Sequence, residues 1–567
     1  MNKELFGVFG GRETFERYRS ASEFDAVLTG SSITVGIRDP GLGTPGWSAR
    51  YESDAGTCVV WGEAYAPNGE TNTARWLLEH VESDGLDTFE RFNGSYLAVV
   101  DPADGEAFVA ADPVRSRECF YTDEPGVRLF GTDAATVAAT HEEPTPRREG
   151  ILEFLHLGLI LGTKTAVEGT HRLPLDSRLT ATEVDSFDRF VYSPREFDYV
   201  EELAARLERA LDRRSNLPGR KGLLLSAGYD SRIFLSAISD LDVSYTVGSL
   251  DAQEVAGAKR VATQYGVDHV AFQPDDRYLY ANRSKVQYSQ GMKESLHIHH
   301  AGYTDEMAVD TIYHGLLCDT FYRGHFTAQD GVDVLGKRVP FERLDPDPNP
   351  VDVLLQKYGY DRDASRELTD RLAIDAEPEA FVREAVGNEV ESVSHRAATT
   401  QNELTCCGIA NQPSVPFHNH LADNFFASFL ATDIELLEWH LQTPPAYRTT
   451  ETFLRACERI DPKILRHNPP DRPHRTTLLN EVEGFVRRKT PFMTSFEPPW
   501  PDRRQLFEQY DLDQRLLSDL RHVHALPARH KLRINDIGTW LEHWSTDPAE
   551  SVPWLKPAER QTVPTNH

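Results

Sequence analysis

The chain has 567 residues, more than one hydrophobic core usually organises, so we expect two or more domains. Hydrophobic residues make up 40% and charged residues 26%, as in an ordinary globular protein, and the net charge of −29 repels nucleic-acid phosphates. No apolar run approaches the ~20 residues of a membrane span, and the N-terminus lacks a signal-peptide core. We therefore expect a cytoplasmic protein with neither nucleic acid nor membrane as a partner.

Residues 1–140 are predicted to form a domain rich in β-strands. Apolar and polar residues alternate over 57–63 and 95–100, and turn-forming residues separate the stretches. One amphipathic helix is predicted at 73–81. This pattern favours stacked antiparallel sheets with flanking helices. Residues 141–199 begin with a polar, proline-bearing stretch and are predicted to be a linker and connecting segment.

The pattern changes in residues 200–440, where predicted helices and strands alternate. A helix at 201–214 leads into an apolar strand that ends at Leu225, and further strands are predicted at 243–248 and 311–313. Such alternation predicts a doubly wound parallel sheet that binds ligands at the carboxyl ends of its strands. Residues 441–567 are predicted to be a helical extension.

The turn after the first of these strands carries the clearest chemical signal. It contains Ser226, Ala227, Gly228, Asp230 and Ser231, and a helical pattern follows it. Small residues let backbone amides approach an anion, and the helix N-terminus adds a positive dipole end. Asp230 would repel a bare phosphate, so we expect it to hold Mg²⁺ against a polyphosphate. The turn lacks the Gly-Lys-Ser/Thr ending of a Walker loop, and an ordinary strand-to-helix turn stays an alternative.

Several motifs occur in the order found in the asparagine synthetase family. Residues 226–231 resemble its SGGxDS pyrophosphate loop, and 314–324 are similar to its SGEGADELFGG segment. Residues 92–98 and 111–115 look like the NGxFA and RDxxG segments of the family's glutaminase domain, and 415–417 resembles the later PF segment. The resemblance covers most of residues 1–440.

This resemblance implies an α+β, Ntn-type N-terminal domain of four αββα layers. An α/β adenine-nucleotide α-hydrolase (ATP pyrophosphatase) domain with a helical C-terminal part would follow it. The implied activity is an ATP-dependent, AMP-forming ligase that joins a small-molecule carboxylate to an amine, with ATP and Mg²⁺ as cofactors. Whether the protein forms a homodimer is left open.

The resemblance also assigns roles to individual residues. Asp230 and Asp319 would share Mg²⁺ and act in catalysis, and Lys489 would stabilise developing negative charge unless it is simply a solvated helix end. Glu254 would either support the nucleotide loops or cap a helix. The residues expected to contact the nucleotide are Leu225, Ser226, Gly228, Ser231, Val247, Gly248, His314 and Gly315.

Three departures from the family pattern affect the expected activity. Phe6 stands where the family has its nucleophilic N-terminal cysteine, and Trp61-Gly62-Glu63 replaces the NGE turn that grips glutamine. Loss of the nucleophile predicts that glutaminase activity is gone, so the amine would be ammonia or part of the substrate. Leu316 replaces a family glutamate, which weakens the case for aspartate as substrate. A nucleotide-binding or partner-binding pseudoenzyme without turnover is the rival reading.

The acidic, lysine-poor composition also predicts adaptation to high salt. Like charges destabilise the compact state by mutual repulsion, and salt screens that repulsion. We therefore expect the midpoint of thermal unfolding to rise between low salt and molar KCl, as followed by circular dichroism. A midpoint that stays level or falls would contradict this hypothesis.

Overall fold

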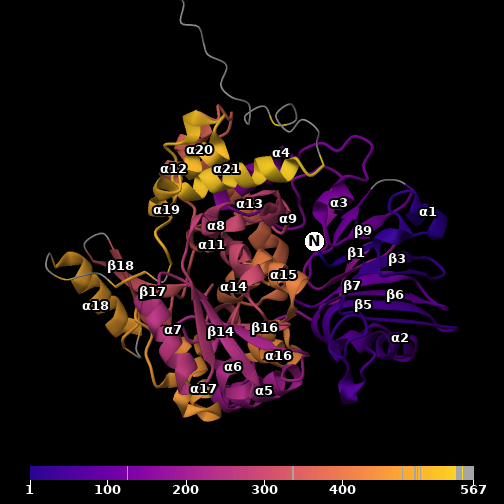
Figure 1. Ribbon diagram of the computed structural model, residues 1–567, viewed down its shortest axis with the longest axis horizontal. Helices are drawn as coiled ribbons and strands as arrows, with labels where there is room; N and C mark the ends of the chain where they lie inside the picture. The colour runs from indigo at the N-terminus through magenta and orange to yellow at the C-terminus, as the bar shows by residue number, and fades with distance from the viewer. Residues whose placement is uncertain are drawn as a thin grey trace, which may run out of the picture.

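The computed structural model describes residues 1–123, 126–334, 337–474, 477–490, 493, 496–498, 500–544 and 552. Figure 1 shows two main bodies: an indigo β-rich body built from the N-terminal part of the chain, and a larger body that contains a parallel sheet and most of the helices. In parts of the hairpin β17 (Gln329–Val334)–β18 (Lys337–Leu344) and of α18 (Thr477–Lys489), the structure describes the backbone alone.

Two six-stranded antiparallel sheets form the N-terminal body. The first has the order β10 (Thr170–Arg172), β8 (Phe120–Thr122), β9 (Leu129–Gly131), β1 (Glu4–Val8), β3 (Thr34–Arg38), β2 (Ala26–Thr29). The second has the order β12 (Val184–Ser186), β11 (Ser177–Leu179), β7 (Phe108–Ala111), β6 (Asn93–Pro102), β5 (Gly56–Tyr65), β4 (Ala49–Ser53).

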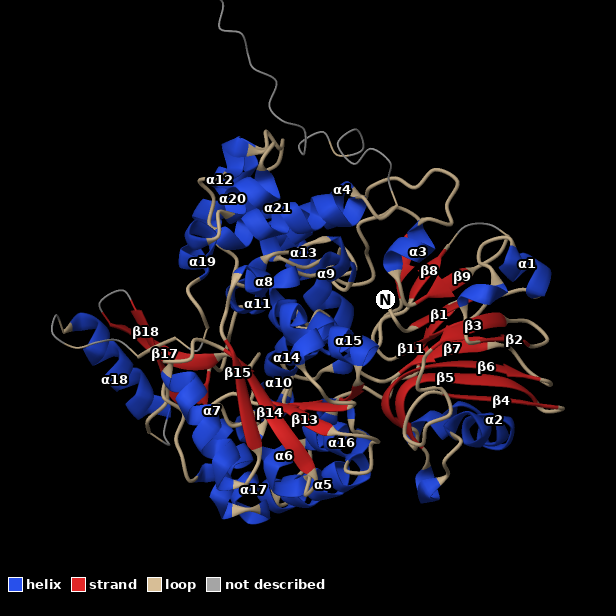
Figure 2. Ribbon diagram, in the orientation of Figure 1, coloured by secondary structure: helices blue, strands red, loops and turns tan. Residues whose placement is uncertain are grey.

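Alternating side chains on these strands build the layers. On β5, Val59 faces the first sheet, whereas Val60 faces the helix α2 (Thr73–Asp84). On β1, Phe6 faces the opposite way and packs against α1 (Arg12–Glu16). The helix α3 (Ala134–Ala138) contacts β8 and β9 (Figure 2). The order is therefore helix, sheet, sheet, helix, which agrees with the expected layering; its assignment to the Ntn type stays a proposal.

The segment 141–199 does more than link two domains. It supplies the helix α4 (Arg148–Leu157) and strands β10, β11 and β12 of the two sheets. The part of the chain predicted as a linker and connecting segment therefore also completes both sheets. The sequence pattern was uninformative because these strands are three residues long, too short to show periodicity.

A five-stranded parallel sheet forms the centre of the second body. Its order is β15 (Asp268–Phe272), β14 (Leu241–Val247), β13 (Lys221–Leu224), β16 (Thr311–His314), β19 (Phe426–Ser428). Helices α5 (Tyr199–Arg214), α6 (Arg232–Ala237) and α7 (Gln253–Gln264) contribute to the apolar cluster that contains Leu223 and Tyr313 of the sheet. The first strands and helices thus follow the predicted alternation.

Helices dominate the remainder of the described chain. Between β15 and β16 lie α8 (Asp276–Leu279) and α9 (Arg283–Gln287), and α10 (Cys318–Tyr322) precedes the hairpin β17 (Gln329–Val334)–β18 (Lys337–Leu344). The later helices are α11 (Pro350–Tyr358), α12 (Arg362–Arg371), α13 (Pro378–Val393), α14 (Thr400–Ala410), α15 (Val415–Asn424), α16 (Ile434–Gln442), α17 (Thr450–Ile460), α18 (Thr477–Lys489), α19 (Arg503–Gln509), α20 (Leu512–Leu517) and α21 (Ala528–Leu541). Figure 1 shows α21 lying beside α4. Across the described ranges, no helix has the length and apolarity needed to cross a bilayer.

A buried network of charges joins the two bodies. Arg214 of α5 is fully buried and pairs with Asp433 at 2.6 Å and with Glu63 of β5 at 3.4 Å. The Glu63 carboxylate also accepts hydrogen bonds from the Ser428 hydroxyl (3.0 Å) and the Phe429 N–H (2.9 Å). Strand β5 of the second antiparallel sheet is thereby tied to β19 of the parallel sheet.

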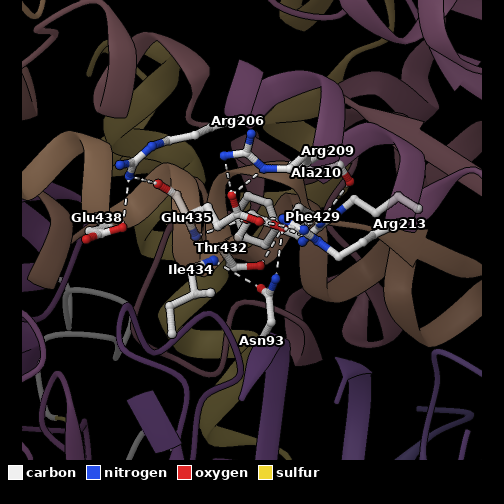
Figure 3. Close-up of polar contacts among 12 residues, drawn as sticks. Asn93, Arg206, Arg209, Ala210, Arg213, Phe429, Thr432, Ile434, Glu435 and Glu438 are labelled. Atoms are coloured by element: carbon white, nitrogen blue, oxygen red, sulfur yellow. Dashed lines mark hydrogen bonds and ion pairs between the residues drawn. The ribbon is translucent and has the colours of Figure 1, made fainter. Parts of the chain in front are cut away.

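Asn93 at the start of β6 adds a second connection. Its side-chain amide donates to Asp433 at 3.0 Å and accepts from the Ile434 N–H at 3.0 Å. Figure 3 shows Asn93 reaching this cluster from one side while Arg206, Arg209 and Arg213 approach from α5. Burial opposes ionisation of Asp433, but Arg214 and Arg213 hold its pKa below the ordinary value.

The network gives a stability prediction for Asp433→Asn. The pKa of Asp433 is lowered in the folded state. The free energy by which its carboxylate stabilises the fold is therefore fully present above its unfolded pKa of about 3.9, and it is lost as the pH falls through the pKa of the folded state. Removing the charge leaves Arg214 buried without this partner, which should cost about 3–5 kcal/mol at pH 7. Urea denaturation should show a difference in the free energy of unfolding from wild type that stays constant above about pH 5 and shrinks as the pH falls below about 4.

Glu16→Gln is the matched control. Glu16 pairs with Arg12 at 2.9 Å on the surface, where both side chains are 49% exposed, so its loss should cost less than about 1 kcal/mol. Equal effects of the two substitutions would contradict the importance assigned to the buried network.

Candidate active site

Two turns meet at the carboxyl edge of the parallel sheet. Strand β13 is followed in the chain by β14, its neighbour on one side, whereas β16 lies on its other side. The direction in which successive strands are added to the sheet therefore reverses between β13 and β16. Such a reversal leaves a crevice where ligands of open α/β sheets bind. Gly315, after β16, lies against the first turn: a Cβ there would be 2.5 Å from the carbonyl carbon of Asp230 and 2.6 Å from the Ser231 nitrogen. Only glycine permits this approach.

The turn after β13, residues 226–231, is called the first turn, and the side chains of Glu254 and Ser226 hold it. Glu254, at the start of α7, accepts a hydrogen bond from the Ala227 N–H at 2.7 Å, and the Ser226 hydroxyl accepts one from the Gly228 N–H at 3.1 Å. The cap of α7 is Ala252, without a side-chain hydrogen bond, so the contact favours the loop-supporting role of Glu254. Burial raises the pKa of Glu254, and the Ala227 N–H opposes that shift.

Arg232 holds the same turn through hydrogen bonds to its carbonyl groups. Its guanidinium is 1% exposed and donates to the carbonyl oxygens of Ala227 and Gly228, the latter at 2.7 Å. It also donates to the Ile464 carbonyl at 3.0 Å, which ties the turn to the segment after α17. The carbonyls of the turn are therefore drawn toward Arg232. Sequence reasoning missed this role, although Arg232 directly follows the predicted loop.

Asp230 lies in the first turn, and Asp319 lies at the start of the short helix α10 that follows Gly315. Arg323 pairs with both oxygens of Asp230 through one nitrogen, at 2.7 and 2.9 Å. Burial raises the pKa of Asp230; Arg323 opposes this, and the charge of Asp319 adds to it. Asp319 lies 3.3 Å from His325 and is 43% exposed. The charge of Asp319 therefore acts on Asp230. Arg323 flanks Asp230 as a cation, whereas the His325 ring, whose pKa is lowered by burial, flanks Asp319.

The pair of carboxylates fits the needs of a Mg²⁺ site. This ion is usually held by one or two carboxylates together with substrate phosphates, and the two carboxylates at this edge of the sheet match that pattern. Among the described residues, no group of three or more metal-binding side chains gathers anywhere. Arg323 contacts Asp230 through Nη1 alone, so lone pairs of both carboxylate oxygens stay available.

The other residues predicted to contact the nucleotide differ in their exposure and in their contacts. Ser226 is exposed and Gly228 and Val247 are half-buried, whereas the Leu225 side chain lies in the apolar core. The Gly248 N–H donates to the Phe272 carbonyl at 3.0 Å. His314 is buried and its Nε2 lies 3.0 Å from Nδ1 of His418, so its ring points toward α15.

Lys489 is the last residue of α18, and its side chain lies outside the described residues. Its proposed role therefore stays a prediction.

Sequence reasoning also missed Arg323 and His325, which flank the two carboxylates. Arg323 falls inside the 314–324 motif, and its spacing from Asp319 along one short helix was an available signal.

Comparisons with known proteins add little. No family model and no curated protein matches the chain. Two solved structures resemble it with a TM-score of 0.21: an allosteric regulatory enzyme of purine biosynthesis, at 11% identity over 66% of this chain and 93% of that one, and the glutamine phosphoribosylpyrophosphate amidotransferase from B. subtilis, at 12% identity over 63% and 89%. Likenesses this weak carry no argument, so the assignment depends on the contacts within the site.

The contacts of the first turn predict the effect of Glu254→Ala. Loss of a hydrogen bond to a charged acceptor should loosen the turn, and exchange of the Ala227 amide should quicken about 10- to 100-fold. Hydrogen–deuterium exchange with peptide resolution measures this directly. Arg260→Ala, on the exposed face of the same helix, is the control and should leave the exchange unchanged. Unaltered exchange in Glu254→Ala would contradict the role given to Glu254.

Proposed function

We propose that the protein is an ATP-dependent ligase that adenylates a carboxylate and then forms an amide, with AMP and pyrophosphate as the other products. The observation that carries the proposal is the close approach of Gly315 to the Asp230 backbone at the strand-order reversal between β13 and β16, with the charge of Asp319 acting on Asp230. The small residues of the first turn, its exposed Ser226 and the adjoining N-terminal end of the α6 segment support the same reading.

The proposed reaction has two steps. A carboxylate oxygen of the substrate attacks the α-phosphorus of ATP, the bond from that phosphorus to the bridging oxygen breaks, and pyrophosphate leaves with the electron pair. A neutral amine then attacks the acyl carbon, AMP leaves, and the nitrogen loses a proton to give the amide. Positioning and charge compensation are the main tasks of the protein in such a displacement.

This chain's own residues have defined parts in that scheme. The 226–231 turn would position the departing pyrophosphate, and Glu254 and Arg232 keep that turn in shape. Mg²⁺ held by Asp230 and Asp319 would offset the charge of the phosphates. Arg323 opposes the rise in the pKa of Asp230 that burial causes, and it holds the carboxylate toward the segment after β16.

We further propose that the N-terminal body does not hydrolyse glutamine. Phe6 carries no nucleophile and is fully buried against Phe15 of α1. Glu63, in the segment that resembles the glutamine-gripping turn, accepts hydrogen bonds from Ser428 and Phe429 and faces Arg214. Its carboxylate is therefore committed to the junction between the two bodies. Free ammonia or an amine of the substrate is then the nucleophile.

The decisive assay is exchange of labelled pyrophosphate into ATP, screened over carboxylates with aspartate plus ammonium first. Wild-type protein should support exchange with at least one carboxylate. Asp230→Asn should lower the rate about 10²- to 10³-fold, because charge stabilisation in the phosphoryl displacement is lost while the side-chain shape is kept. Asp268→Asn, an exposed substitution at the start of β15, is the control and should match wild type. Equal rates for Asp230→Asn and wild type would refute the assignment.

A nucleotide-binding pseudoenzyme is the second candidate. The contact of Arg323 with both oxygens of Asp230 favours it, because a guanidinium in that place competes with a metal ion. The two candidates differ in outcome: the pseudoenzyme binds ATP in calorimetry but gives no exchange with any carboxylate.

A further inference from the structure

A chain of hydrogen bonds runs from the N-terminal body to the turn after β16, residues 315–317, which we call the second turn. It joins an aspartate, two serines and two histidines, which are in order Asp112, Ser116, Ser95, His418 and His314. Helix α15, which carries the first of the two histidines, lies on the side of the second body that faces the N-terminal sheets (Figure 2). All five side chains are at most 2% exposed, so they depend on one another for hydrogen bonds.

The carboxylate end of the chain sets its direction. Burial raises the pKa of Asp112, but hydrogen bonds from Ser116 and Val114 oppose that shift, and an ionised carboxylate only accepts. The Ser116 hydroxyl therefore donates to Asp112 at 2.7 Å. Because that hydrogen is taken, the Ser116 oxygen accepts from the Ser95 hydroxyl at 2.7 Å. The Ser95 oxygen in turn accepts from Nε2–H of His418 at 3.3 Å.

A backbone N–H sets the same direction from the other end. The Leu316 N–H donates to Nδ1 of His314 at 3.3 Å, so this ring nitrogen is the unprotonated one. Burial lowers the pKa of His314 to about 3 and that of His418 well below its ordinary value, so both rings are neutral at pH 7. The His314 ring then carries its hydrogen on Nε2 and donates to Nδ1 of His418 at 3.0 Å. The two ends share no atom, yet both require the Nε2–H tautomer in both rings.

The second turn, which this chain reaches, has a strained backbone. Leu317 has a φ of 65°, in the left-handed region that is unfavourable for residues other than glycine. Gly315 of the same turn lies against the backbone of Asp230, and Asp319 follows at the start of α10. The hydrogen bond of the Leu316 N–H therefore holds a turn that sets the places of two groups of the candidate active site.

We propose that Ser95 and Ser116 are positioning residues for the candidate active site, because they orient the His314 ring through His418 and so hold the second turn. Both serines lie in or beside segments that resemble the family's glutaminase domain. The N-terminal body would thereby act on the neighbouring site through hydrogen bonds rather than through a reaction of its own. The proposal rests on the proposed function in treating the second turn as part of an active site.

Nuclear magnetic resonance of the full chain, isotopically labelled at the histidine nitrogens, tests the direction of the chain without ATP. Protonated and unprotonated ring nitrogens resonate far apart, so each tautomer is read directly, and His314→Gln and His418→Gln assign the signals. We expect the hydrogen on Nε2 of both rings at pH 7. A hydrogen on Nδ1 of either ring would overturn the proposal.

Ser95→Ala tests whether the serines act on the second turn. The change removes the acceptor that Nε2 of His418 uses, so the tautomers of His418 should become mixed. Exchange of the Leu316 amide with deuterium should then quicken about tenfold, because its acceptor is no longer held in one tautomer. Ser95→Thr keeps the hydroxyl and should restore both readouts. If Ser95→Ala fails to fold, Ser116→Ala, which removes the next hydroxyl, carries the test.

Ser48→Ala is the matched control. Ser48 is also fully buried in the N-terminal body, but its hydroxyl donates to Asp39 and not to the chain. Exchange of the Leu316 amide should stay at the wild-type rate in this variant. Equal quickening in Ser48→Ala and Ser95→Ala would mean a general loosening and would overturn the proposal.

Unchanged exchange at Leu316 in the variants of Ser95 and Ser116 would also overturn it, because the serines would then not act on the second turn. Neither measurement uses ATP or a carboxylate. A wild-type protein without pyrophosphate exchange would therefore refute the ligase proposal alone and leave these results readable.

Discussion

The buried contact of Arg214 with Glu63 and Asp433 is the constraint on which the arrangement of the two bodies depends. All three side chains are fully buried, so the charges have only one another and nearby hydrogen-bond donors to stabilise them. Arg214 closes helix α5, which leads into β13, and Glu63 lies on the long strand β5. The network therefore fixes the N-terminal sheets against the strand whose end carries the candidate active site.

Residues that resemble glutaminase segments serve here as structural groups. Glu63 and Asn93 both reach across to the region around Asp433, where buried polar atoms need partners. Phe6, which stands at the position of the nucleophile in the sequence resemblance, is buried in an apolar cluster with Phe15. The same polar side chains then contribute to cohesion between the bodies, and Arg117 is buried nearby against the rings of Trp47 and Trp61.

Two arginines shape the candidate active site. Arg232 donates hydrogen bonds to the carbonyls of the first turn, and Arg323 donates to the Asp230 carboxylate. Both act on groups that the sequence pattern identified: Arg323 lies within the 314–324 motif, and Arg232 directly follows the predicted loop. Their effect is to preorganise a turn of small residues that would otherwise lose much conformational entropy on ordering.

The sequence by itself determined the local features: the alternating strands of the N-terminal body, the strand–turn–helix at 221–237 and the glycine at 315. These follow from periodicity and from backbone sterics, which act over a few residues. Only the tertiary structure decided that residues 141–199 complete the sheets, that Arg323 pairs with Asp230, and that Glu63 faces Arg214. Those contacts join residues about 90 to 150 positions apart, or strands too short to show a pattern, so packing of the whole chain rather than local preference selects them.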